Sequence, residues 1–435
     1  MDQAAGIDEA AEPPETPEAA YENFVWANLR RNYAGNYIHG MLGMTGFRLL
    51  SAPTFIPIFL HQLSGSDAIV GLGAGLQQLG GLISPIVSAS QIEHRKRVMP
   101  SAMLIGSLMR LAVAGMALAS WFMRGQPLLL SMLVLLFLFG VFSGAQRVAF
   151  QLLLAKVIPI VRRGRLQAWR NLTGGAIAAV LTWAAGRYLI GQNFLGHGYS
   201  VTFAVTFVLT SLGLTALQLL LREPDPTTLR PRVRILDRLR DFPALLSGDR
   251  GFLFFMIAQT LAVAGRIAMP FYVLFAQTSI ELTGATLGLL GFAYLGADTA
   301  SNLVWGYLGD KSGFRSACVI SLAVWLASTI LLLCAHTLPT IALALAGLGA
   351  AGSGYNMSSQ TMVLEFGLRE DMAMRLAFSS TAEGLTAALG PLLGGLIAKG
   401  FGYSPLLWIS GGFVAAALLV LVTLVEEPRL RRHTT

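Results

Sequence analysis

The chain alternates between long apolar stretches and short polar or glycine- and proline-marked turns, and this pattern predicts twelve membrane-spanning helices. A helix needs about 20 mostly apolar residues to cross the hydrocarbon core of a bilayer. Such stretches lie at 34–60, 68–92, 98–122, 127–156, 166–190, 199–221, 251–277, 285–309, 316–337, 339–366, 374–398 and 403–425. The pattern therefore predicts an all-α polytopic membrane protein.

The second half of the chain repeats the first. Five pairs of matching residues carry the repeat: Pro53 and Pro270, Gly71 and Gly288, and Glu93 and Asp310 at a spacing of 217, and Arg165 and Arg375, and Gly174 and Gly384, at a spacing of 210. Parallel repeats of this kind build transporters with a solute site near the middle of the membrane, between the two halves. We therefore expect two pseudo-symmetric six-helix bundles.

These elements predict five segments. We expect a disordered acidic tail at 1–22, an N-terminal bundle at 23–221, a basic linker at 222–250, a C-terminal bundle at 251–425 and a short tail at 426–435. The acidic start is unlike the basic beginning of a signal peptide.

Composition and charge agree with a membrane protein. Hydrophobic residues are 54% of the chain and charged residues only 12%, about half the share usual in soluble proteins, which excludes an aqueous globular fold. Of the 31 Lys and Arg residues, 22 fall on one side of the predicted membrane and only Arg124, Arg187 and Lys399 on the other. This asymmetry predicts that both termini are cytoplasmic, with the chain in the cell (inner) membrane. The basic residues form no stripe that would bind nucleic acid.

Six ionisable residues lie inside the predicted spans at a depth where a charge is costly. They are Arg48, Arg110, Arg147, Arg266, Asp298 and Glu383. Four arginines against two acids leave a surplus of two positive charges, if all are ionised. Because buried unpaired charge is unfavourable, this surplus favours a small organic anion as the transported solute.

Arg48 and Arg266 occupy matching places near the middle of the first span of each half. A guanidinium binds carboxylates and phosphates well because it is planar and remains charged, so both are candidate anion ligands. The alternative for Arg266 is a salt bridge with Asp298, one helix later, and the two roles can alternate. We expect Arg110 to serve packing or an intradomain pair, whereas Arg147 and Gln151 share a helical face and are candidate solute ligands.

Asp298 and Glu383 are candidate proton carriers, with structural ion pairs as the alternative. No histidine is expected deep in a span, which leaves these two acids as the groups that would couple transport to protons. Tyr272, Tyr355, Asn356 and Gln360 are candidate hydrogen-bonding partners of the solute, although polar contacts between helices would explain them equally well.

The loop GYLGDKSGFRS at 306–316 resembles the signature that follows the second and eighth spans of the major facilitator superfamily. The slots of that signature are filled by Gly306, Asp310, Lys311, Gly313 and Arg315. The first copy, SASQIEHRKR, keeps Glu93, Arg95 and Arg97 but lacks the glycines. The RRGR turn at 162–165 and the GPLLGG run at 390–395 extend the resemblance over nearly the whole chain.

The resemblance implies that Asp310 and Glu93 close a cytoplasmic gate by capping a helix across the interface between the halves; an ordinary charged turn is the alternative. It also links Arg48 and Arg266 to the arginine pair of the superfamily's organophosphate/phosphate exchangers, which clamps phosphate. Drug/proton antiporters of the superfamily typically carry a Gly-Pro motif in the fifth span. Here that span contains no proline, which weighs against multidrug efflux.

Together these features predict a secondary transporter, a symporter or antiporter, that moves a small organic anion by alternating access. The alternatives are a proton-coupled exporter of drugs or lipophilic metabolites and a sensor or scaffold that binds a ligand without transporting it. We expect no enzyme, no cofactor and no metal site, because the six histidines are scattered and no catalytic cluster is evident. The expected partners are the solute, a coupling proton and the lipid bilayer, for a chain that acts as a monomer.

Overall fold

The computed structural model describes residues 16–92, 97–224, 249–366 and 372–426, and these are almost entirely helical. The N-terminal half contains α1 (Pro17–Ala27), α2 (Leu29–Ser51), α3 (Phe55–Ser64), α4 (Asp67–Ile92), α5 (Met99–Phe122), α6 (Gly125–Val157), α7 (Ile160–Ala184), η1 (Ala185–Ile190), η2 (Phe194–Gly196) and α8 (Gly198–Leu220). The C-terminal half contains α11 (Arg250–Ala264), η3 (Gly265–Phe271), α12 (Tyr272–Ala276), α13 (Gly284–Ser312), α14 (Phe314–Cys334), α15 (Leu338–Val363), α16 (Met372–Phe401) and α17 (Tyr403–Thr423).

Each predicted span corresponds to one of these helices or to a broken helix. The first span of each half is the broken one: α2 ends before Pro53 and α3 continues it, while α11 passes through η3, which contains Pro270, into α12. Proline interrupts a helix because it has no N–H to donate. Residues 17–22, expected in the disordered tail, instead begin α1, whose first turn is capped by the Thr16 side chain accepting from the Ala19 N–H at 3.3 Å. Charges and prolines had suggested disorder, but Thr16 followed by proline starts a helix well.

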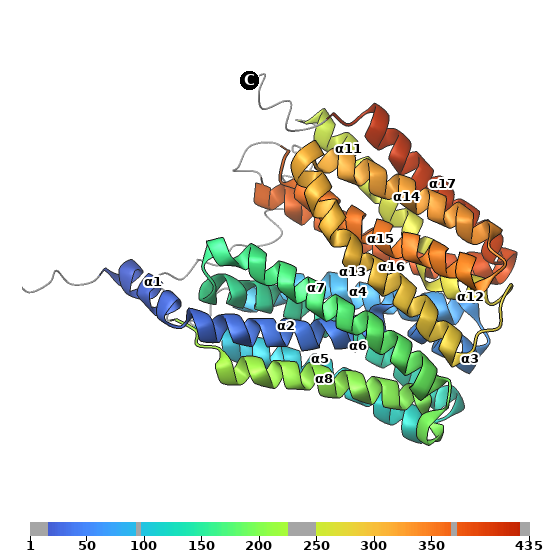
Figure 1. Cartoon of the computed structure of the whole chain (residues 1–435), viewed down its shortest axis with the longest axis horizontal. Helices are drawn as coiled ribbons and strands as arrows, with labels where there is room; N and C mark the ends of the chain where they lie inside the picture. Colours follow the sequence, from blue (N-terminus) through green and yellow to red (C-terminus); the bar gives the residue numbers. More distant parts are fainter. Residues whose placement is uncertain (1–15, 93–96, 225–248, 367–371, 427–435) are drawn as a thin grey trace, which may run out of the picture.

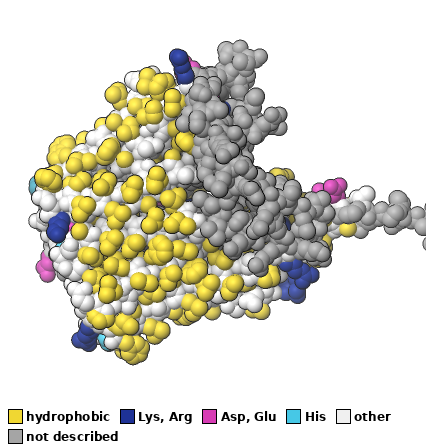
Figure 2. All heavy atoms as spheres, turned by 180° about the vertical axis from the view of Figure 1, so that it is seen from behind, with side chains coloured by type: hydrophobic (Ala, Val, Ile, Leu, Met, Phe, Trp, Pro, Cys, Tyr) yellow, Lys and Arg dark blue, Asp and Glu magenta, His cyan; other side chains and the backbone are white. Residues whose placement is uncertain are grey.

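Nine helical segments of the described chain are long and apolar enough to cross a membrane. The three predicted spans that fall outside this set are α4, α7 and α13, and they are three of the four helices that pack between the halves, α4 against α16 and α7 against α13. Helices buried against protein need less apolar surface than helices that face lipid. Figure 2 shows a broad molecular face covered with hydrophobic side chains, with Lys, Arg, Asp and Glu largely at its edges.

The two ends of the bundle differ. We call the end where α8 stops and α11 starts the linker end, and the opposite end the far end. The halves are inclined to each other and converge toward α3 and α12, at the far end (Figure 1). There Gly71 meets Pro391 so closely that a Cβ on Gly71 would lie 2.2 Å from the proline carbonyl oxygen, and Gly288 approaches Gly186 in the same way. These contacts hold the two halves together at the far end.

A carboxylate ties three helices together at the linker end of the N-terminal half. Glu223 accepts hydrogen bonds from the backbone N–H groups of Val98 and Met99 at 2.7 and 2.9 Å, and its Oε1 lies 3.0 Å from Lys156 Nζ. The Glu223 side chain is only 3% exposed. It therefore caps the start of α5, where the helix dipole favours a negative charge, and pairs with the end of α6.

Substituting Glu223 by alanine is expected to lower the free energy of unfolding by about 1–3 kcal/mol, because it leaves the N–H groups of Val98 and Met99 without their acceptor and removes the carboxylate that Lys156 contacts. Thermal unfolding of the purified protein in detergent would measure this change. Glu281→Ala is the matched control, since Glu281 is exposed. Equal unfolding temperatures for the two variants would contradict the assigned role.

Candidate functional site

An ion pair at the centre of the molecule joins the two halves. Arg48 lies in the last turn of α2, and its Nη1 donates to Asp298 Oδ2 at 2.8 Å and to Thr299 Oγ1 at 2.9 Å, both on α13. Both charged side chains are 22% exposed. The approach depends on Gly175 of α7, because a Cβ there would lie 2.8 Å from Arg48 Nη1 and 2.1 Å from Thr299 Oγ1.

A second ion pair lies within the C-terminal half. Arg266 is carried by η3, and its Nη1 is 3.6 Å from Glu383 Oε1 on α16. Its Nη2 donates a hydrogen bond to the Asn356 side-chain oxygen on α15. The side chains of Arg266 and Glu383 are 22% and 24% exposed, so this pair remains accessible to a small solute.

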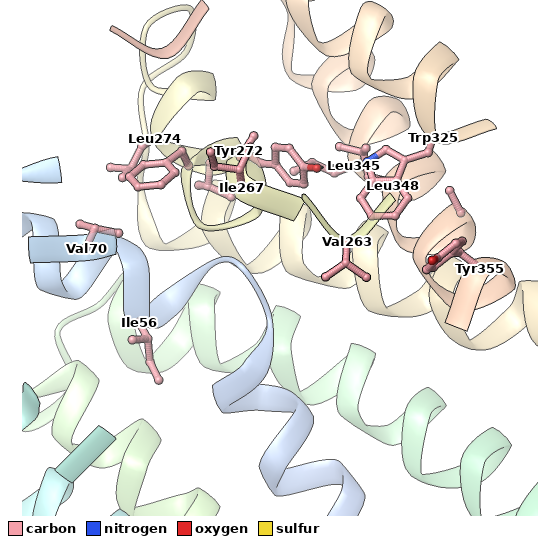
Figure 3. Close-up of a cluster of buried hydrophobic side chains, with 14 of the residues drawn as sticks. Ile56, Val70, Val263, Ile267, Tyr272, Leu274, Trp325, Leu345, Leu348 and Tyr355 are labelled. Carbon is pink, nitrogen blue, oxygen red and sulfur yellow. Dashed lines mark hydrogen bonds between the residues drawn. The ribbon is translucent and has the colours of Figure 1, made fainter. Parts of the chain in front are cut away.

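Aromatic rings surround the Arg266 guanidinium. Its carbon lies 5.5 Å from the ring centre of Tyr355 and 5.9 Å from that of Trp325. Tyr272 is buried beside them and accepts a hydrogen bond from Trp325 Nε1 at 3.3 Å, and Figure 3 shows these three side chains in one cluster. A cation over aromatic faces is stabilised by the ring quadrupoles, so the rings hold the guanidinium in place beside Glu383.

The expected alternative pair of Arg266 with Asp298 is not formed. Asp298 binds Arg48 of the other half, and Arg266 binds Glu383. Although Asp298 follows Arg266 by one helix in the sequence, α13 packs against α7 and so turns this part of the helix toward the N-terminal half. As a result, each of these two arginines has an acidic partner, and the surplus of positive charge that favoured an anion does not lie at the centre.

The other two deep arginines have different environments. Arg110 is 2% exposed and donates to the carbonyl oxygens of Thr210 and Gly106 at 2.7 and 2.6 Å, while its guanidinium lies 5.5 Å from the Phe47 ring centre. The expectation that it serves packing within its own half agrees with this. Arg147 is exposed on α6, as is Gln151 one turn later. Among the described residues, neither is bonded to the two central ion pairs.

The remaining polar candidates lie around Arg266 or on the helix face next to it. Asn356 contacts Arg266, and Tyr355 and Tyr272 belong to the aromatic cluster around it. Gln360 is exposed one turn along α15 from Asn356, and so it shares the face that carries the Arg266 contact.

Sequence reasoning missed two residues at these sites. Thr299 adjoins Asp298 but was not singled out, and Trp325 lies on an apolar helix where nothing in the sequence marked it. His39 of α2 is buried, since it is 5% exposed and stacks on Phe150 with 4.5 Å between ring centres. Burial within the protein does not give depth in the membrane, so the expectation that no histidine lies deep in a span stays a prediction.

The signature loop lies at the linker end. Gly313 has φ +85°, a conformation that favours glycine, and the loop turns there from α13 into α14. Arg315 donates to the Val422 carbonyl oxygen at 2.9 Å, whereas Asp310 and Lys311 are exposed. Glu93 and Arg95 lie outside the described residues, and Arg97 is exposed. The gating role of these charges stays a prediction.

Comparison with known protein families gives a match to the Major Facilitator Superfamily over residues 40–265 and again over 251–435. The two matched segments correspond to the two halves of the chain.

Solved structures of transporters have the same fold. A mutant of the nucleoside transporter NupG is similar with a TM-score of 0.71 and 14% identity, covering 91% of this chain and 100% of NupG. A D-xylose-proton symporter has a TM-score of 0.69 and 14% identity, with 94% and 99% coverage. The human organic anion transporter MFSD10 has a TM-score of 0.60 and 15% identity, with 94% and 100% coverage. At this identity the likeness establishes the fold and leaves the solute open.

Proposed function

The chain belongs to the major facilitator superfamily and is a multi-pass membrane transporter, and on that premise we propose that it moves a small organic anion together with a proton by alternating access. The observation that carries this proposal is the pair of arginine–carboxylate contacts at its centre, one of which spans the two halves.

The paired charges favour coupling to protons. An anion that binds Arg48 or Arg266 must replace Asp298 or Glu383. A displaced carboxylate in a poorly solvated site is costly as an anion and takes up a proton to become neutral. Anion and proton therefore bind together, and the charge balance of the site is unchanged.

The Arg48–Asp298 contact would link this exchange to the conformational change. It joins α2 to α13 across the two halves, so an anion that takes the place of Asp298 removes one bond between them. At the other pair, Asn356 and Gln360 offer amide donors and acceptors to the rest of the solute next to Arg266.

Two ion pairs at the centre fit a polar solute better than a lipophilic drug, because an apolar drug would displace water from the charged side chains without replacing its hydrogen bonds.

We further propose that the chain acts as a monomer. We also propose that it lies in the cell inner membrane with both termini cytoplasmic, on the basis of its charge asymmetry. In that orientation Asp310 lies at the cytoplasmic side, where it would cap a helix when the linker end closes.

Uptake by proteoliposomes with an imposed proton gradient tests the proposal. Asp298→Asn and Glu383→Gln are each expected to reduce proton-driven accumulation of organic anions by about tenfold or more, because the proton acceptor is lost. Exchange of anion between preloaded and external pools should continue, since exchange needs no net proton movement. Glu281→Gln, at an exposed site, is the control.

Two results would overturn the proposal. Undiminished proton-driven accumulation in both variants would exclude these acids as the coupling groups. Accumulation of an uncharged sugar or nucleoside in place of any anion would show that the central arginines serve a neutral solute.

A further inference from the structure

A hollow of about 650 Å³ lies at the linker end between the beginnings of α2 and α7. Three arginines and three aromatic residues line it: Arg30, Tyr33 and Tyr37 from α2, and Arg162, Arg165 and Trp169 from α7. It is separate from both central ion pairs, and the transport mechanism uses none of these side chains.

The three arginine side chains of the hollow differ from their neighbours in their contacts. Within residues 16–92, 97–224, 249–366 and 372–426, none of these three guanidinium groups has a hydrogen-bond or ion-pair partner. Neighbouring arginines behave differently: Arg31 donates to the Leu220 carbonyl oxygen at 2.8 Å, and Arg163 to the Ile158 carbonyl oxygen at 2.8 Å.

The arginine at the matching position of the second half, unlike Arg165, has an acidic partner. Arg375 occupies the place of Arg165 in the other half, and its Nη1 lies 2.9 Å from Asp249 Oδ2. Arg165 has no such carboxylate among the described residues. Within the described part of the chain, the guanidinium groups of the hollow are therefore not neutralised by a carboxylate.

The exposed surface of α7 next to the hollow changes from basic to apolar along the helix. Along one stripe of α7, Arg162 and Arg165 are followed by Trp169 and, further on, by Val180, which is 52% exposed. These positions are separated by three, four and eleven residues, so they share a helical face. A change from basic to aromatic to apolar residues is typical of a helix face that passes from the headgroup region into hydrocarbon.

We propose that this hollow binds the headgroup of an anionic phospholipid. The phosphate would receive paired N–H donors from the arginines, which suit its geometry, and hydroxyl donors from Tyr33 and Tyr37. The apolar walls and Trp169 would contact the glycerol and the start of the acyl chains. A lipid occupant matches both the three arginines, which have no acidic partner among the described residues, and the stripe that ends in exposed apolar side chains.

Native mass spectrometry of the full chain in micelles that contain phosphatidylglycerol and phosphatidylcholine tests this. The unaltered protein should retain phosphatidylglycerol preferentially. Arg162→Gln with Arg165→Gln should weaken that binding about 20- to 30-fold, which is the expected effect of two arginines near an anionic headgroup. Arg162→Lys with Arg165→Lys should retain most of it, because the charge remains.

The matched control removes two exposed arginines at the far end, Arg124→Gln with Arg187→Gln, and should leave binding unchanged. Unfolding temperatures in phosphatidylcholine alone verify that the variants fold. Equal retention of the two lipids, or an equal loss in the control, would overturn the proposal. Displacement of phosphatidylglycerol by inorganic phosphate or glycerol phosphate would instead assign the hollow to soluble anions. No step of this test depends on transport activity.

Discussion

Replacing Arg266 by alanine is expected to lower anion transport by about a hundredfold or more. The substitution removes the guanidinium that contacts Glu383 and Asn356, and it leaves Glu383 without its cation. Loss of one partner from such a pair typically costs about 2–5 kcal/mol. Initial rates of proteoliposome uptake measure the effect, and Arg187→Ala, at an exposed far-end arginine, is the control.

A double variant separates solute binding from the isolated charge on Glu383. Arg266→Ala combined with Glu383→Gln removes both charges and so leaves no unpaired carboxylate. If Arg266 binds the anion, the double variant stays inactive. Near-native transport by the double variant would show that Arg266 serves only to neutralise Glu383, and it would remove this arginine from the solute site.

Replacing Gly288 by valine is expected to block transport by preventing the far end from closing. A Cβ at Gly288 would lie 2.6 Å from the Trp183 carbonyl oxygen and 3.1 Å from Gly186 Cα, and these backbone atoms cannot move aside as a side chain would. Overpacking of this kind costs about 1–3 kcal/mol. We therefore expect the fraction of molecules with a closed far end to fall by about tenfold to a hundredfold.

Gly71→Val should likewise lower the fraction with a closed far end, at the α4–α16 contact. Gly412→Val is the control, because nothing lies within 4 Å of a Cβ at that position.

A buried reporter would detect the shift directly. Thr182 is fully buried on α7, beside Gly291 of α13. Thr182→Cys, in a protein whose two cysteines are replaced by serine, should react slowly with a thiol reagent and faster once Gly288→Val is added. Unchanged labelling together with lost transport would mean that the substitution damages something other than the closed far end.

The helical framework followed from the sequence. All twelve predicted spans match helices or broken helices in the structure, and the prolines of the repeat, Pro53 and Pro270, lie where the first helix of each half is interrupted. Such features depend on local properties, namely the length of an apolar stretch and the missing N–H of proline. The repeat also placed Gly71 and Gly288, which proved to be matching close contacts between the halves.

The partners of the charged side chains did not follow from the sequence. The sequence offered Asp298, one helix later, as the alternative partner of Arg266, whereas the structure pairs each of them with a residue from another part of the chain. Trp325 gave no signal at all, since an aromatic residue on an apolar helix has no feature that shows which neighbour it will face.

The sequence by itself determined the number of spans, the twofold repeat, the position of the helix breaks and which six residues carry charge within the spans. Only the tertiary structure decided that Arg48 and Asp298 join the halves, that Glu383 neutralises Arg266, and that Arg162 and Arg165 line one hollow with Arg30. The physical reason is that insertion into a bilayer depends on the composition of each segment, whereas an ion pair depends on the rotation and crossing of helices that are distant in the chain.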